Sequence, residues 1–168
     1  KNLRSRYMSS GGKDDRFDAF VLADTLRTDR ARLRPLVPDS PATIALRAAV
    51  RARRDLVAHR VSACNQLRAH LAVAFPGAIG LFSELDSPVS LAFLAAFPGQ
   101  RAAARLDEQA LAAWLATVPR RGNTAPAGVL AARLAAAPRG AAGADAAQAA
   151  VTAQLAAATA GLAGRVRA

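Results

Sequence analysis

The chain has 168 residues, enough for one ordinary domain with its own core. Its single cysteine excludes a disulfide framework and a thiolate metal cluster. The formal net charge is +11, and all but two of the 23 basic residues are arginine. Such an excess favours a nucleic-acid partner, although a G+C-rich genome would also produce an arginine- and alanine-rich chain.

No stretch reaches the roughly 18 consecutive apolar residues that a membrane span needs. Residues 1–7 lack the apolar run of a signal peptide. We therefore expect a cytoplasmic protein with no membrane partner.

The first predicted element is a helix over about 14–27, with Asp14 as its cap. Asp15 and Asp18 lie one turn apart on one face. Two interpretations are open. The commoner one is that both are solvated acids, which the helix dipole stabilises. The other is that they are two ligands of a divalent metal ion. The 3.6-residue period predicts a core-facing side formed by Phe17, Val21, Leu22 and Leu26.

Residues 30–38 alternate in polarity and predict an edge strand or a loop. Ser40 and Pro41 then start a long helix, because no Gly or Pro occurs from residue 42 to 75. A heptad repeat runs along this helix, although Arg53 and Arg60 interrupt its second seam; the repeat consists of Val50, Val57, Cys64 and Leu71. The pattern fits a coiled-coil arm that forms a homo-oligomer through residues 41–75. It fits equally a long helix that packs against later helices of the same chain.

Arginine is much more frequent than acid on this helix, where Asp55 is the only carboxylate. A coiled coil with balanced flanks would mix both signs. We therefore predict phosphate contacts by this surface, against the simpler alternative of a solvated face, and assign them to Arg47, Arg51, Arg54, Arg60 and Arg68.

The remainder predicts a small helical region over 76–137 and a linker with an alanine-rich segment over 138–168. Helix starts are indicated at Ser87, Asp107 and Thr124. Alanine contributes 28 of the last 68 residues, so helices there would bury little surface. The alanine-rich segment is either a helix that returns along the long helix or disordered.

Several motifs occur in the order typical of one family. They are Lys13-x-Asp15-x-x-Asp18-Ala19, Leu22-Ala23-Asp24-x-Leu26-Arg27-Thr28-Asp29, Leu33-Arg34-Pro35-Leu36, Asn65-Gln66-Leu67-Arg68, Phe75-Pro76-Gly77 and Ala137-Pro138-Arg139-Gly140. The chain thus resembles the insertion sequence 110 family of transposases, which are DEDD-type enzymes similar to the Piv/MooV invertases. The extra acid Asp14 departs from the family pattern.

The resemblance implies a mainly α fold. Residues 1–38 would be the C-terminal remnant of an α/β RuvC-like (RNase H-like) catalytic domain, and residues 39–75 a long basic helix of coiled-coil type. Residues 76–137 would form a small helical bundle, followed by the linker and alanine-rich helix of 138–168. The chain would then be a fragment of a longer enzyme.

The same resemblance implies a DNA recombinase guided by a structured bridge RNA, located at the bacterial nucleoid. Asp15 and Asp18 would be its catalytic, metal-binding acids, with Mg²⁺ as cofactor. Asp24 and Asp29 are assigned to capping and ion pairing. The partner Asp and Glu and the serine nucleophile are not matched here, so the chain alone is expected to be inactive. The alternative function is a non-catalytic helical module that binds nucleic acid and dimerises.

Overall fold

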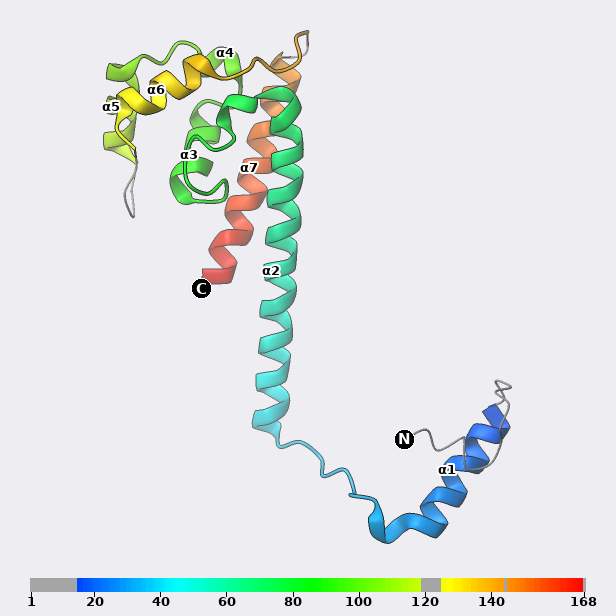
Figure 1. Cartoon of the computed structure of the whole chain (residues 1–168). Helices are drawn as coiled ribbons and strands as arrows, with labels where there is room; N and C mark the ends of the chain where they lie inside the picture. The colour runs from blue at the N-terminus through cyan, green and yellow to red at the C-terminus, as the bar shows by residue number, and fades with distance from the viewer. Residues whose placement is uncertain (1–14, 119–124, 144, 168) are drawn as a thin grey trace. The chain divides into compact units, whose positions relative to one another are not determined.

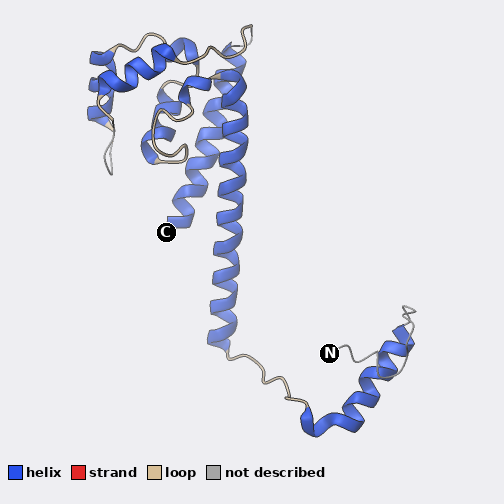
Figure 2. Ribbon diagram, viewed as in Figure 1, coloured by secondary structure: helices blue, strands red, loops and turns tan. Residues whose placement is uncertain are grey.

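The computed structural model describes residues 15–118, 125–143 and 145–167. All regular elements in these ranges are helices, which confirms the mainly α prediction (Figure 2). The chain divides into two units, residues 1–44 and residues 45–168. No helix among the described residues combines the length and apolarity that a membrane crossing requires.

The first unit contains the helix α1 (Asp15–Asp29) and the short 3₁₀ helix η2 (Arg30–Arg32). Residues 33–40 follow without regular structure, so of the two interpretations the loop is found. A strand needs a neighbour with which to share hydrogen bonds, and the described residues supply none. The proposed cap Asp14 lies outside the described residues.

The apolar side of α1 is only partly buried. Val21 is 2% exposed and Phe17 is half-buried, but Leu22 and Leu26 are 64% and 56% exposed. The prediction that these two leucines face a core is therefore wrong for the described structure. The helical period was correct, but it could not say whether this chain supplies the covering surface.

The long helix α2 spans Pro41–Ala74. Its start is fixed by Ser40, whose hydroxyl oxygen accepts a hydrogen bond from the backbone nitrogen of Thr43 at 3.2 Å. It ends immediately before Phe75 and Pro76, as the sequence predicts. A helix of 34 residues is roughly 50 Å long.

Six shorter elements complete the described part of the second unit (Figure 1). They are η3 (Pro76–Ala78), α3 (Pro88–Ala96), α4 (Gln100–Ala103), α5 (Glu108–Thr117), α6 (Ala127–Ala136) and α7 (Asp145–Arg167). Ser87 and Asp107 cap α3 and α5 by accepting hydrogen bonds from backbone N–H groups, at 3.3 and 2.8 Å. The helix starts predicted at these two residues are confirmed.

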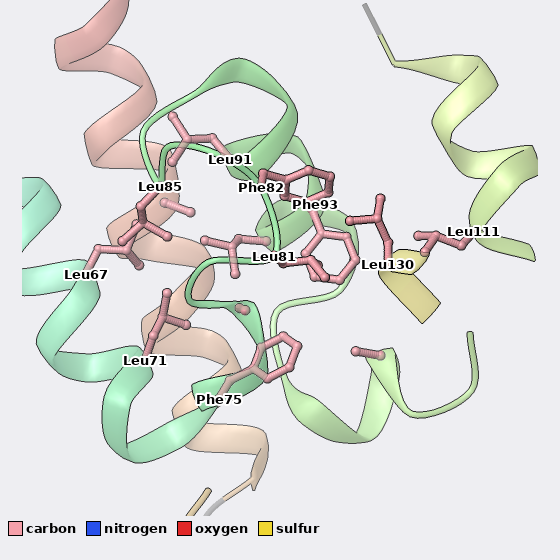
Figure 3. Close-up of a cluster of buried hydrophobic side chains, with 14 of the residues drawn as sticks. Leu67, Leu71, Phe75, Leu81, Phe82, Leu85, Leu91, Phe93, Leu111 and Leu130 are labelled. Carbon is pink, nitrogen blue, oxygen red and sulfur yellow. The ribbon is translucent and has the colours of Figure 1, made fainter. Parts of the chain in front are cut away.

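Phe93 of α3 is at the centre of the core and is 1% exposed (Figure 3). Its ring packs between aromatic rings at centroid distances of 5.3 to 6.3 Å, contributed by Phe75, Phe82, Phe97 and Trp114. Leu67 and Leu71 of α2 join the same core and are fully buried. The core thus forms around the last three turns of α2.

The alanine-rich segment is the helix α7, which runs beside the C-terminal half of α2 (Figure 1). The positions that it buries are small and spaced four, three and four residues apart: Thr152, Ala156, Thr159 and Ala163. His70 of α2 contacts α7 through Nε2, which lies 2.9 Å from the Thr152 hydroxyl and 3.1 Å from the Gln148 carbonyl oxygen. Small side chains permit a close approach to α3, the helix with which α7 makes most of its contacts, so α7 packs without a large apolar face.

The interpretation of α2 as a long helix that packs against later helices of the same chain is confirmed for its C-terminal turns, and the coiled-coil interpretation stays a prediction. Its last turns pack against later helices of the same chain, whereas no side chain between residues 45 and 61 is buried. We call residues 45–61 the arm. Leu71 of the heptad repeat and its neighbour Leu67 are not available to a second copy of the helix, because the chain's own core covers both.

The backbone at Gly140 packs closely against the C-terminal end of α2. Its backbone N–H donates to Gln100 Oε1 at 2.7 Å, and the next residue, Ala141, donates to the carbonyl oxygen of Val73 at 2.9 Å. A Cβ atom at position 140 would lie 2.5 Å from the carbonyl oxygen of Ala74. The backbone can approach the helix end this closely only with glycine.

We expect Gly140→Ala to destabilise the chain by roughly 1–3 kcal/mol, because backbone must move to admit the methyl group. Gly161→Ala is the matched control. Position 161 is an open helical site on α7, where alanine should stabilise by about 0.5–1 kcal/mol. Urea unfolding followed by circular dichroism measures both. Equal effects of the two substitutions would contradict this account of Gly140.

Candidate nucleic-acid interface and carboxylate pair

The two candidate metal ligands lie in the first turn of α1. Asp15 is exposed and Asp18 is half-buried. Because the two residues are three positions apart in the helix, their side chains leave it on the same side. The positive end of the helix dipole stabilises both carboxylates there.

The same side of α1 continues as an apolar stripe. Leu22 and Leu26 follow Asp18 by four and eight residues and are both more than half exposed. At the other end of α1, Asp24 binds Arg27 at 2.8 Å, and Asp29 lies 3.9 Å from Arg32. The ion pairs expected of Asp24 and Asp29 are therefore present.

No group of three or more His, Cys, Asp or Glu side chains within the described ranges could hold a metal ion. Asp15 and Asp18 thus offer oxygen ligands of the type that hard divalent cations prefer, but only two of them. Such a pair fits one part of a ligand set.

The candidate phosphate ligands lie on α2, and four of the five are exposed. Arg47, Arg51 and Arg54 follow each other at intervals of four and three residues, which places them on one face of the arm. We call these three residues the arginine strip. Arg68 lies two heptads beyond Arg54, toward the same side of α2, and is also exposed.

The surface between Arg54 and Arg68 is shallowly hollowed. Small and polar side chains line it, together with one valine: Ala58, Val61, Ser62, Asn65, Gln66 and Ala69. A helical rotation of 100° per residue places this surface roughly opposite Leu67 and Ala74, which face the core. The arginine strip and the hollow thus form one surface that points away from the helical body.

Arg60 differs from the other four arginines. Its Nη1 atom lies 3.5 Å from Asp86 Oδ2, its side chain is 35% exposed, and its Nε atom is buried without a hydrogen-bond partner. This ion pair holds the loop before α3 against α2. Arg60 is therefore already bound to a carboxylate within the chain.

Cys64 lies one turn beyond Arg60, where it packs against the core. Burial raises the pKa of its thiol, and the negative charge of Asp86 raises it further. Both effects favour the neutral thiol, so Cys64 acts as a small apolar side chain at this position.

Sequence reasoning missed two contacts that shape this surface. Asp86 directly precedes the predicted helix start at Ser87, but the sequence gave no sign that it pairs with Arg60, 26 residues earlier. His70 carried no signal at all, because its partners are a backbone carbonyl and a threonine on α7. Neither contact has a local spacing from which it could be predicted.

Comparison with known proteins identifies the class. The family model DEDD_Tnp_IS110, described as "Transposase", matches residues 1–76. The match thus includes α1 and all of α2. No solved structure matches the chain.

Two curated relatives extend the similarity beyond α2. A protein named as the transposase y4uE, from Sinorhizobium fredii, is 36% identical over 110 residues, which is 66% of this chain and 31% of the relative. A protein named as the mini-circle transposase for IS117, from Streptomyces coelicolor, is 36% identical over 125 residues, which is 72% of this chain and 30% of the relative. The chain therefore spans about a third of the length of these relatives.

These findings place the chain among the transposases of insertion sequences. The chain belongs to the IS110 family, as its motifs predict. The alternative of a non-catalytic module is not favoured by the comparisons.

Proposed function

We propose that this chain acts in DNA transposition, as the part of an IS110-type transposase that holds nucleic acid on its arm and contributes two carboxylates to strand cleavage and exchange. The observation that carries the proposal is the arginine strip, which is exposed on a helix whose only acid is Asp55. Asp55 pairs loosely with Arg54, at 4.0 Å. Three guanidinium groups on one exposed helix face give this surface a positive potential.

The spacing of the arginine strip suits a phosphate backbone. The three arginines rise along the helix by about 6 and 4.5 Å. Successive phosphates of a duplex strand follow every 3.4 Å or so along its axis, within reach of such long side chains. Each guanidinium can bind a phosphate through two N–H groups, which an ammonium cannot do in the same way.

Phosphate contacts position a nucleic acid without reading its sequence. The strip would therefore serve the two partners that the family resemblance implies, DNA and a structured bridge RNA. Of the five predicted contacts, we retain Arg47, Arg51, Arg54 and Arg68 as direct ligands. Arg60 is a weaker candidate, because a phosphate would compete with Asp86 for it.

For the reaction, we propose that Asp15 and Asp18 hold a divalent cation, Mg²⁺ by resemblance. The cation would stabilise charge on the oxygens of the scissile phosphate. The two carboxylates would bind and orient it from the first turn of α1, with the remaining protein ligands supplied by a partner Asp and Glu that this chain does not match. Mg²⁺ tolerates such sharing, because it keeps several water ligands.

The exposed stripe of Leu22 and Leu26 supports the proposal that α1 belongs to a RuvC-like domain. The strands of such a domain would cover the two leucines and place Asp15 and Asp18 at the catalytic centre. We keep the proposed boundaries: residues 1–38 for this domain, 39–75 for the coiled-coil helix, 76–137 for the small bundle, and 138–168 for the linker and α7. The site of action would be the bacterial nucleoid, where the DNA is.

A homo-oligomer through residues 41–75 also remains a proposal. The fold restricts the part of this helix that is open to a second copy. Cys64, Leu67 and Leu71 pack on the chain's own core, so most of the open apolar surface of α2 lies on the arm and on the first residues of the helix, with exposed Val73 beyond them. Exposed aliphatic side chains of this kind favour association.

We predict that the chain alone neither nicks nor joins DNA, because two carboxylates without their partner acids and nucleophile cannot complete the reaction. Supercoiled plasmid incubated with the purified chain and Mg²⁺ or Mn²⁺ should stay intact. Nicking that depends on the metal and disappears in Asp15→Ala would refute this prediction. Nicking that persists in Asp15→Ala would point to a contaminating nuclease.

We predict that the chain binds duplex DNA and structured RNA with strong salt dependence. The triple variant Arg51→Ala, Arg54→Ala, Arg68→Ala removes three of the proposed phosphate ligands. Its slope of log K against log salt on duplex DNA should then fall by about 0.9 for each phosphate that the variant no longer neutralises. Fluorescence anisotropy over a salt series measures this slope.

The matched control is Arg105→Ala, Arg133→Ala, Arg139→Ala. It removes the same charge from exposed positions outside α2. Its slope should remain close to that of the original chain. Equal slopes for the two triple variants would show that only net charge matters, and that α2 is not the interface.

A further inference from the structure

The second unit contains a cavity of about 290 Å³ where three helices meet. The C-terminal end of α2, the helix α4 with the loop before it, and the first turns of α7 surround this space, at the end of the unit where α7 begins (Figure 1). Its apolar walls include Ala74, Pro98, Ala102 and Ala149. We call it the α4–α7 cavity. It lies outside the arm and contains neither acid of the carboxylate pair.

Contacts between distant segments hold the walls of the α4–α7 cavity in place. The backbone N–H of Gly140 donates to Gln100 Oε1 at 2.7 Å, which fixes the side chain of Gln100. The carbonyl oxygen of Gln148 lies 3.1 Å from His70 Nε2, which holds the first turns of α7 beside α2. The cavity is therefore largely preformed, as binding sites for small ligands usually are.

Two primary amides line the cavity between its apolar walls. Gln100 uses its amide oxygen for Gly140, so its Nε2 group remains as a donor. The side-chain amide of Gln148 has no hydrogen-bond partner within the described residues, so it offers a donor and an acceptor. Such groups beside an apolar space match a nucleobase, whose flat ring has hydrogen-bonding groups along its edge.

The charges beside the cavity favour a base over a free anion. Arg101 Nη1 lies 3.7 Å from Asp145 Oδ2, so these two charges compensate each other. Arg105 also lines the cavity, but it is exposed, and solvent ions screen its charge. A free phosphate would leave the apolar walls uncovered. Asp145 is the one carboxylate among the lining residues, which is too few for a divalent metal ion.

The volume of the cavity limits its ligand to a single base. Pockets for drug-sized ligands measure roughly 300–1,000 Å³, and this cavity is at the lower end of that range. A base inside a duplex is stacked on both faces, and its edge is paired, so it cannot enter such a cavity. An unpaired nucleotide has both its faces and its edge available.

We propose that the α4–α7 cavity binds the base of one unpaired nucleotide, of the kind found in a loop, a bulge or a single-stranded end. The alanines and Pro98 cover the faces of the ring, and the amides of Gln100 and Gln148 bind its edge. This inference rests on the proposed nucleic-acid binding and adds a second contact outside the arm. The arginine strip contacts phosphates and cannot distinguish paired from unpaired bases, whereas the cavity can.

A pair of alanine substitutions tests the cavity. Ala146 and Ala147 are both exposed in the first turn of α7, but only Ala146 lines the cavity. Ala146→Phe adds a ring at the cavity without a change of charge, and Ala147→Phe is its matched control. Fluorescence anisotropy compares a blunt duplex with the same duplex that carries a single-stranded extension, as RNA and as DNA.

The original chain should bind the extended duplex about fivefold more tightly than the blunt one, which is the lower end of what one stacked base contributes. Ala146→Phe should remove this gain and leave the affinity for the blunt duplex unchanged. Ala147→Phe should keep the gain. A gain with RNA alone or with DNA alone supports the proposal and identifies the strand that supplies the nucleotide.

A second pair of variants tests the amide. Gln148→Met removes the amide of Gln148 but keeps the length of its side chain and its backbone contact with His70. Gln154→Met is the matched control, because Gln154 is an exposed residue of α7 outside the cavity. Gln148→Met should weaken binding of the extended duplex by about fivefold, since an amide paired with a base edge contributes that much or more. Gln154→Met should not.

The proposal stands if Ala146→Phe and Gln148→Met both remove the gain from the extension while their controls keep it. Equal binding of the two duplexes by the original chain would overturn the proposal and leave the arm as the interface. Equal effects of a variant and its control would overturn it as well. The proposed function fails separately, if the triple arginine variant of α2 binds the blunt duplex with unchanged affinity.

Discussion

The structure depends on how α2 is held. A helix of 34 residues cannot bury its whole length in a body of this size, and only its last three turns enter the core, through Leu67, Leu71 and Ala74. Phe75, Gly140 and His70 hold this end, by ring packing, by a close backbone approach and by hydrogen bonds to α7. The arm has no such support before Arg60, and most of its side chains are exposed.

The arginines of α2 fall into two groups, one on the arm and one beside the core. Those on the arm extend from a helix with almost no acid, where a phosphate would be the strongest ligand available. Arg60, at the border of the body, is neutralised by Asp86 instead. One helix thus uses the same residue type for two purposes, a structural ion pair near the core and an exposed basic surface away from it.

Much of this fold could be predicted from local signals. Helix starts are indicated by Ser40, Ser87 and Asp107, and the end of α2 by Phe75-Pro76. These signals are local because caps and prolines act on their immediate neighbours. Contacts between segments that are far apart in the sequence could not be predicted from such local signals. The heptad of α2 indicated an apolar seam correctly, but not that the chain's own core would cover Leu71.

The packing of the helix α7 could not be predicted from local signals either. Val151, Leu155 and Leu162 are large apolar side chains of this helix, but Val151 is 41% exposed. The buried stripe consists of threonines and alanines, which hydropathy does not single out. For the candidate metal site, the spacing correctly predicts that Asp15 and Asp18 lie on one side of α1. The described residues supply no further ligands for a metal ion there.

Hydrogen exchange along α2 tests the central claim most directly, since it reports how well each turn is supported. We expect amides near Leu67 and Leu71 to exchange at least about tenfold more slowly than those of the arm. Addition of a blunt RNA duplex should slow exchange in the arm and leave the core end unchanged. Uniform protection along the whole helix, or an arm that RNA leaves unchanged, would contradict the account.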